Sequence, residues 1–150
     1  MRESPKYFAL GLKLGLLDGN QVQNWVIEQI RTNDSPSDMF LDLAYLDDSD
    51  VKEMYSKLLA MPDDRDDFNV LRGLLSIVQD TQLNNLDFCK QLAEGLYAVY
   101  VENNYECPSD FNEIGFLDDA FCLAMQNTYG SLEDAHRDLI EFVHSFRQNC

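Results

Sequence analysis

The sequence predicts an all-α protein, and three observations lead to this prediction. Apolar residues recur three and four positions apart through most of the chain, as they do on one face of a helix. Serine or aspartate precedes many of these segments, as at helix starts. The only β-branched and aromatic run, residues 98–102, continues a helical pattern. We expect about eight helices in antiparallel hairpins, forming a single domain over residues 1–150 as a compact bundle or a HEAT-like stack.

The first two helices are predicted from the N-terminal third of the chain. Ser4 is a typical N-cap, and Pro5 suits the first helical position because the backbone N–H that it lacks is not needed there. We expect this helix to end at residues 18–20, Asp-Gly-Asn. The second helix is expected over about residues 21–31. Its apolar face carries Trp25, which we therefore place in the core.

Three further helices are expected between residues 35 and 78. Ser35 is the predicted cap of a short helix whose first residue is Pro36. The acidic turn at residues 47–50 precedes a fourth helix, which Met61-Pro62 ends. A second acidic segment, residues 63–67, starts the fifth helix. Both acidic segments therefore stand at helix starts, where the helix dipole favours an anion.

The C-terminal half predicts three more helices. The first covers about residues 86–100 and is followed by a loop at residues 103–110. The next is expected over roughly residues 111–129, with a possible break at Gly115. Ser131 then caps the last helix.

The chain is strongly acidic. Its 150 residues include 27 acidic and 11 basic side chains, which give a formal net charge of −16 and a pI near 4.2. Phosphate-rich surfaces bind clustered Lys and Arg, so this charge argues against nucleic acid and anionic membrane as partners. No segment approaches the roughly 20 apolar residues of a membrane span. We expect a basic protein as the partner; the alternative is that the charge only keeps the protein soluble.

Two stretches carry most of this charge. Residues 34–67 contain eleven acidic and three basic residues, a net charge of −8, with enough apolar residues between them to fold. Residues 102–146 contain ten acidic residues and Arg137, a net charge of −9. Residues 1–33 and 68–101 are nearly neutral. If the helices of both acidic stretches share one side of the fold, the protein has a single strongly negative face.

The candidate partner-binding residues are carboxylates crowded into the same turns, and two tyrosines beside acidic residues. Helix capping explains some of these acids structurally, but it does not explain why so many share the same turns. Tyrosine next to charge is a favoured composition for protein interfaces. The candidates are Asp47, Asp48, Asp50, Asp63, Asp64, Asp66 and Asp67 first, Asp118 and Asp119 second, and the tyrosines Tyr100 and Tyr105.

No motif for catalysis or metal binding accompanies these acids. The acidic run at residues 63–68 lacks the glycine and the ligand spacing of an EF-hand loop. Two Glu-x-x-His pairs, Glu133/His136 and Glu141/His144, lie on one predicted helix about 12 Å apart, so they cannot share a di-iron centre. We interpret them as polar pairs on the helix surface. We expect no enzymatic activity, no metal and no cofactor; a carboxylate-based metalloenzyme is the least favoured alternative.

The cysteines and the N-terminal segment indicate the cellular compartment in which we expect the protein. None of the four cysteines forms a CxxC pair. Cys89 and Cys122 lie in apolar helical patterns, where we expect them to pack as small hydrophobic residues. Lys13 interrupts the N-terminal apolar run, and no small-residue cleavage site follows it, so a signal peptide is not predicted. We therefore expect reduced thiols and a cytoplasmic protein.

The chain resembles the immunity proteins of bacterial toxin–immunity systems, including those paired with contact-dependent growth inhibition toxins. The resemblance covers most of the chain and rests on four segments. These are residues 15–27 with Gly-Leu-Leu and Trp-Val-Ile, residues 41–44 (Leu-Asp-Leu-Ala), residues 116–121 (Phe-Leu-Asp-Asp-Ala-Phe) and residues 129–134 (Tyr-Gly-Ser-Leu-Glu-Asp). It implies a small cytosolic bacterial protein without catalytic residues that binds and blocks a cognate toxin, often a nuclease.

Two functions follow from these observations. The first is a non-enzymatic inhibitor that neutralises a basic toxin, expected to be a nuclease, through its acidic surface. A nuclease must hold phosphates in a cationic cleft, and carboxylates on an inhibitor could occupy that cleft and speed the association. The second is an α-helical adaptor or scaffold that binds its partner through an apolar groove, with acids that only solubilise it.

Overall fold

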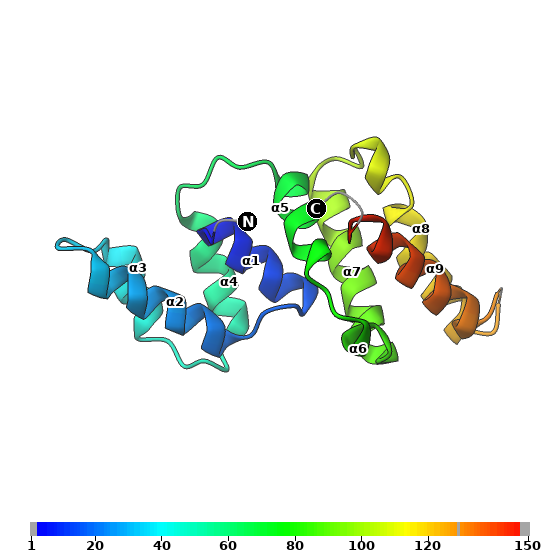
Figure 1. Ribbon diagram of the computed structural model, residues 1–150, viewed down its shortest axis with the longest axis horizontal. Helices are drawn as coiled ribbons and strands as arrows, with labels where there is room; N and C mark the ends of the chain where they lie inside the picture. The colour runs from blue at the N-terminus through cyan, green and yellow to red at the C-terminus, as the bar shows by residue number, and fades with distance from the viewer. Residues whose placement is uncertain (1–2, 129, 148–150) are drawn as a thin grey trace. The chain divides into compact units, whose positions relative to one another are not determined.

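A computed structural model describes residues 3–128 and 130–147 of the chain. This part contains nine α-helices, one 3₁₀-helix and no β-strand, which confirms the all-α prediction (Figure 1). Contacts divide the chain into two compact units, residues 1–66 and 67–150. We call them unit 1 and unit 2 and describe each by itself. The assignment of residues 1–150 to a single domain remains a prediction.

Unit 1 consists of four helices. They are α1 (Pro5–Leu14), α2 (Gly19–Thr32), α3 (Asp38–Ala44) and α4 (Val51–Ala60). Helix α1 packs against α4, and α2 packs against α3. Trp25 lies in the core, as predicted, with its ring stacked on that of Phe8 at a centroid distance of 4.5 Å. Val26, Leu43, Met54 and Leu58 complete the centre of this core.

The first helix ends earlier than the sequence predicted. Ser4 caps α1 as expected, because its hydroxyl accepts a hydrogen bond from the Tyr7 N–H at 3.2 Å. The helix then ends at Leu14, since Gly15 adopts a left-handed conformation with φ of 76° that closes the last turn. Asp18 does not end α1 but caps α2, in a reciprocal capping box with Gln21.

The third helix begins later than predicted. Ser37, not Ser35, is its cap, and the Ser37 hydroxyl accepts a hydrogen bond from the Met39 N–H at 3.2 Å. The first helical residue is Asp38, so Pro36 lies outside the helix. The two serines at this site compete as caps, and the second has the extended backbone that a cap requires. Helix α4 ends at Ala60, next to Met61-Pro62 as predicted.

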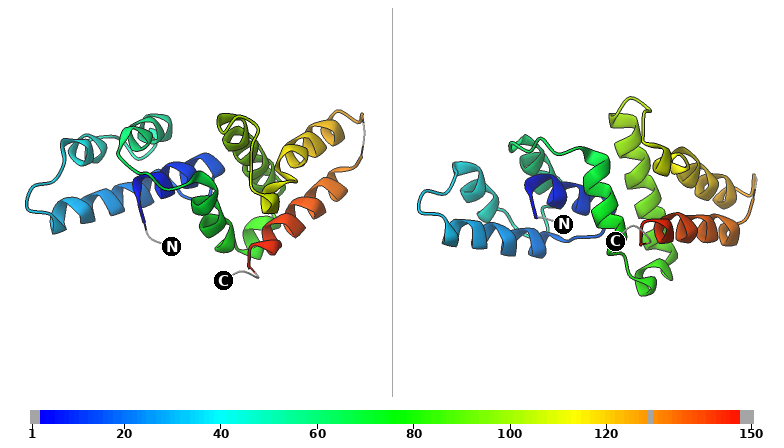
Figure 2. Two further views of the ribbon diagram at one scale, coloured as in Figure 1. Left: turned by 90° about the horizontal axis from the view of Figure 1, so that it is seen from above. Right: turned by 45° about the horizontal axis from the view of Figure 1, so that its top comes forward.

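Unit 2 contains the remaining helices. They are α5 (Asp67–Ser76), α6 (Asp80–Leu83), α7 (Leu86–Glu102), the 3₁₀-helix η1 (Ser109–Phe111), α8 (Ile114–Met125) and α9 (Leu132–Ser145). Helix α8 packs against both α7 and α9, and the three helices lie together in both views of Figure 2. The α8 and α9 helices form an antiparallel hairpin. Helix α9 also contacts α5 and α7, and α6 packs against α7.

Three sequence predictions in unit 2 need correction. The single turn α6 was not predicted, because four residues are too few for a periodic signal. The helix expected from residue 111 begins at Ile114, since residues 109–111 form the separate turn η1. Gly115 does not break this helix but lies in its first turn. The helix ends at Met125, four residues before its predicted end, and Tyr129 itself lies outside the described residues.

Phenylalanine rings fill the centre of unit 2. The Phe111 ring lies 5.0 Å from that of Phe68 and 4.8 Å from that of Phe146, measured between centroids. Phe142 contacts Phe146 in an edge-to-face arrangement at 5.1 Å. These four side chains join α5, η1 and the end of α9, so residues that are distant in the sequence pack together in this core.

In the part of the chain that is described, every helix is too short or too polar to cross a membrane.

The close approach of Gly19 to a loop carbonyl in unit 1 gives a stability prediction. A Cβ atom at Gly19 would lie 1.8 Å from the Asp48 carbonyl oxygen, so the loop before α4 packs directly on the first turn of α2. We expect Gly19→Ala to lower the free energy of unfolding of unit 1 by about 1–3 kcal/mol, because backbone must move to admit the methyl group. Fluorescence of Trp25, the chain's only tryptophan, during urea unfolding measures this loss.

Asn20→Ala is the matched control. Asn20 is exposed in the same turn of α2, and its replacement is expected to change stability by less than about 0.5 kcal/mol. Equal effects of the two substitutions would contradict the packing of the loop on Gly19.

Candidate protein-binding surface

The first-choice aspartates lie at opposite ends of one helix. Residues 47–50 precede α4 and residues 63–67 follow it. Within unit 1, the ten residues of α4, about 15 Å of helix, stand between residues 47–50 and residues 63–66. The acidic stretch at residues 34–67 therefore does not present one row of carboxylates.

The acidic turn before α4 is partly ordered by its own serine. Asp47 accepts hydrogen bonds from the Ser49 N–H at 2.9 Å and the Ser49 hydroxyl at 2.7 Å. These bonds hold the pKa of Asp47 below its usual range. Asp50 occupies the N-cap position of α4, yet its side chain makes no capping hydrogen bond. Asp48 and Asp50 are exposed, and both remain accessible to a partner.

Asp63 has a structural role at the start of α1. Its carboxylate accepts hydrogen bonds from the Lys6 N–H at 3.0 Å and the Arg65 N–H at 3.2 Å, and its side chain is only 7% exposed. Burial by itself raises the pKa of Asp63, but hydrogen bonds from Lys6, Ser4 and Arg65 outweigh it, so the net pKa is lowered. We therefore leave Asp63 out of the proposed interface.

The neighbours of Asp63 differ in exposure. Asp64 and Asp66 are exposed. Asp67 is half-buried in the first turn of α5, where it accepts a hydrogen bond from the Asn103 side-chain amide at 3.1 Å. Asp67 belongs to unit 2, and the preceding aspartates belong to unit 1. The segment predicted as one acidic site is thus divided between structural and exposed carboxylates.

In contrast, the second-choice aspartates and both tyrosines meet on one surface of unit 2. We call it the acid–tyrosine surface, and it also includes two residues that the sequence analysis did not select. Its residues come from α7, the loop after α7, and α8: Glu94, Tyr97, Tyr100, Tyr105, Asp118 and Asp119. Packing of α7 against α8 brings them together.

The tyrosine rings form a chain of contacts on this surface. Tyr100 lies 6.2 Å from Tyr97 and 5.6 Å from Tyr105, measured between ring centroids. Asn104 and Tyr105 both have positive φ values of 61°, which turn the chain back after α7 so that the Tyr105 N–H bonds the Tyr100 carbonyl at 3.0 Å. The Tyr105 side chain is 60% exposed. A large aromatic side chain is therefore held outward by an ordered turn.

Negative charges crowd around these rings. Burial, followed by the charges of Glu94 and Asp119, raises the pKa of Asp118. Partial desolvation and then the neighbouring Tyr105, Asp119 and Asp118 raise the pKa of Tyr97. Such shifts mean that the surface disfavours further negative charge, and a cationic group placed there would relieve the repulsion.

The cysteines and histidines of the described residues are not grouped as metal ligands. Burial raises the pKa of the Cys89 thiol to about 11, as expected for an inert core cysteine. Cys122 is exposed, so its predicted packing as a core residue is wrong; it lies on the side of α8 that carries Asp118. Over residues 3–128 and 130–147, no three His, Cys, Asp or Glu side chains are grouped so that they could hold a metal ion.

The two histidines on α9 bond to other helices. His136 Nε2 lies 2.5 Å from the Leu83 carbonyl, to which it donates, and His144 Nε2 lies 2.9 Å from the Asp80 carboxylate. Their interpretation as local pairs with the glutamates three positions earlier is therefore wrong. Arg147 also contacts Asp80 at 2.8 Å, so the end of α9 is fastened to α6.

Comparisons with known proteins do not assign this chain to a family. The chain matches no protein-family model, and searches of curated proteins and of solved structures gave no match. The site is therefore interpreted from its own residues.

Tyr97 and Glu94 are the residues of the surface that sequence reasoning missed. Both lie on α7 within two turns of Tyr100, at positions 94, 97 and 100. Spacing by three residues on a helix is a signal for a shared face, and it could have linked them. Their proximity to Asp118 and Asp119 depends on helix pairing, which no local pattern reveals.

The buried carboxylate of Asp63 predicts a pH-dependent contribution to stability. The folded pKa lies below the unperturbed value of about 3.9, so the stabilisation is present above pH 4 and is lost as the pH falls through the folded pKa. We expect Asp63→Asn to lower the free energy of unfolding by about 1–3 kcal/mol at pH 7, with a smaller difference at pH 3. Urea unfolding followed by Trp25 fluorescence measures both values.

The exposed neighbour provides the control for this experiment. Asp64→Asn should change stability by less than about 0.5 kcal/mol at either pH. A difference between the Asp63 variant and wild type that stays constant from pH 7 to pH 3 would contradict the assigned role of the charge.

Proposed function

We propose that this protein is a non-enzymatic inhibitor that binds a basic protein, a toxin nuclease of the kind blocked by bacterial immunity proteins. The acid–tyrosine surface of unit 2 supports the proposal best. It combines carboxylates with an outward aromatic ring, and such a combination suits a partner that is rich in Arg and Lys. The resemblance of the sequence to immunity proteins points to the same class.

The surface offers both parts of a typical interface. Tyr105 is exposed, yet its ring packs edge-to-face on that of Tyr100 at 5.6 Å, so it would anchor a contact with little further loss of side-chain entropy. Asp118 and Asp119 lie near Tyr97 on the same surface and would pair with cationic side chains of the partner. Charge pairs of this kind favour specificity and fast association.

The exposed aspartates of unit 1 have a supporting role in this proposal. Asp48, Asp50 and Asp64 lie in the turns at the two ends of α4. With a net charge of −16 on the chain, they add to a long-range field that attracts a basic protein. Such a field raises association rates by roughly 10–10³-fold at low ionic strength.

The experiment expresses the protein encoded by the gene next to that of this chain and measures its binding to this chain. Dissociation constants are determined between 50 and 500 mM NaCl, together with inhibition of the toxin's nuclease activity. We expect Asp118→Asn with Asp119→Asn to weaken binding about tenfold, equivalent to about 1.4 kcal/mol, and to reduce the salt dependence. Tyr105→Ala should weaken it by a similar or larger factor, and Tyr105→Phe by less.

The matched control replaces Asp50 and Asp64 by asparagine. It changes the net charge by the same amount on exposed residues of unit 1, and it should lower the association rate more than it raises the dissociation rate. Tight binding that is indifferent to salt and to the Asp118 and Asp119 substitutions would count against this function. That result would favour the adaptor, whose acids only solubilise it.

A further inference from the structure

Helix α8 has more apolar surface than its core contacts use. Ile114, Leu117 and Phe121 are buried in unit 2, as expected for the inward face of an amphipathic helix. However, Phe116 is 74% exposed and Leu123 is also exposed. Phe116, Ala120 and Leu123 follow a spacing of four and three residues, so they form a second apolar face. A helix that is apolar on several sides is normally covered.

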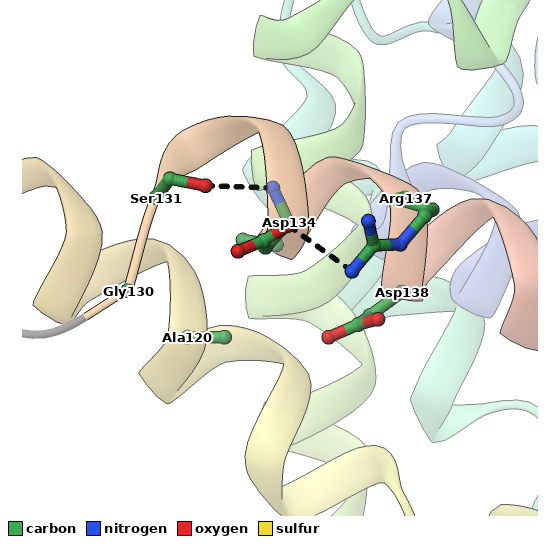
Figure 3. A pocket seen from close by; sticks show the side chains of 7 residues that line it. Ala120, Gly130, Ser131, Asp134, Arg137 and Asp138 are labelled. Carbon is green, nitrogen blue, oxygen red and sulfur yellow. Dashed lines mark hydrogen bonds and ion pairs between the residues drawn. The ribbon is translucent and has the colours of Figure 1, made fainter.

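This second face borders a furrow between α8 and α9. Three hollows of about 500, 310 and 320 Å³ follow the two helices. The first and second both border Ala120 and Asp138, and the second and third both border Glu113 and Glu141. Figure 3 shows one end, where Ala120 on α8 and Asp138 on α9 point toward one another. We call this hollow the α8–α9 furrow, and its principal residues are Glu113, Phe116, Ala120, Asp134, Asp138 and Glu141.

The two walls of the furrow differ in chemistry. The α8 wall is apolar, with Phe116 and Ala120. The α9 wall carries Asp134, Asp138 and Glu141 at helical spacing, so their carboxylates follow one side of that helix over about 10 Å. Glu113, just before the first turn of α8, adds a further carboxylate.

Little within unit 2 neutralises these carboxylates. Arg137 pairs with Asp134 at 3.1 Å, as seen in Figure 3. Within residues 3–128 and 130–147, Glu113, Asp138 and Glu141 have no Lys or Arg ion pair. Three unneutralised carboxylates beside exposed apolar side chains fit a ligand that brings both positive charge and apolar groups.

We propose that the α8–α9 furrow binds a cationic amphipathic helix of a partner protein. The apolar side of that helix would cover Phe116 and Ala120, while its Lys and Arg side chains would pair with Asp138, Glu141 and Glu113. The furrow follows α9 from Ser131 to Ser145, about 20 Å, which suits about 14 helical residues. A second copy of this chain is a poor occupant, because it would bring further acids to an acidic wall.

The furrow and the acid–tyrosine surface use different residues of α8. Phe116 and Asp118 lie about 160° apart around α8, since successive residues are turned by about 100°. Helix α8 therefore presents one surface beside α7 and another beside α9. The inference does not rest on the toxin-inhibitor function and can be tested without a toxin.

The test uses a synthetic peptide and the full chain. The peptide has about 14 residues, with leucines at helical spacing on one side and lysines on the other. Its isomer has the same composition in an order without an apolar face. Titration at 150 mM NaCl is followed by amide NMR spectra and fluorescence of a label on the peptide. We expect saturable binding of the first peptide, with shifts concentrated in α8 and α9, and at least fivefold weaker binding of the isomer.

Substitutions in the furrow separate its two walls. Phe116→Ala should weaken binding at least fivefold, and Asp138→Asn with Glu141→Gln at least tenfold with a smaller salt dependence. The control, Asp50→Asn with Asp64→Asn, makes the same charge change in unit 1 and should alter affinity less than twofold. All five side chains concerned are exposed, and far-UV circular dichroism verifies that each variant is folded.

Two results would overturn the proposal. Equal binding of both peptides, or equal losses in the furrow variants and the control, would show attraction to net charge alone. A concentration-dependent dimer in sedimentation equilibrium that Phe116→Ala abolishes would instead assign the furrow to a second copy of the chain.

Discussion

Repulsion between carboxylates constrains how this chain can fold. With 27 acidic and 11 basic residues, most acids have no cation available, so they must face solvent or accept hydrogen bonds from backbone N–H groups. Asp18 and Asp63 do the latter at the starts of α2 and α1. The hydrogen bond from the Lys6 N–H to the Asp63 carboxylate also connects two residues that are 57 positions apart in the sequence. Within the acidic stretch of residues 34–67, the acids that accept backbone hydrogen bonds therefore stabilise the fold, whereas other acids are exposed to solvent.

The same distinction decides which acids suit a partner. Asp63 is buried against α1, Asp47 is held by Ser49, and the acids before and after α4 are separated by the length of that helix. Asp118 and Asp119 are instead joined by tyrosines from α7 and its following loop. The number of charges in the sequence favoured the aspartates at residues 47–50 and 63–67 as the binding site. The structure instead favours Asp118 and Asp119, because they lie near exposed tyrosines and a binding site requires groups that can contact one partner together.

Helix α8 connects the two proposed binding surfaces. Its sequence is apolar on more faces than the unit 2 core can cover, and it carries Asp118 and Asp119 on the side next to α7. Exposure of Phe116 and Leu123 on the remaining face leaves apolar area in water without an intramolecular contact that would compensate. Charge and exposed apolar area therefore coincide on one helix.

The sequence by itself determined the helical class, most helix positions, the burial of Trp25 and the acidic character, because these follow from local periodicity, capping residues and composition. It could not place Ser37 ahead of Ser35 as a cap, since both residues have suitable side chains. It also could not show that Asp63 faces Lys6, that Tyr97 joins Asp118, or that Asp138 faces Ala120. Each of these depends on which helices pair, and pairing is decided by the fit of whole apolar faces in three dimensions.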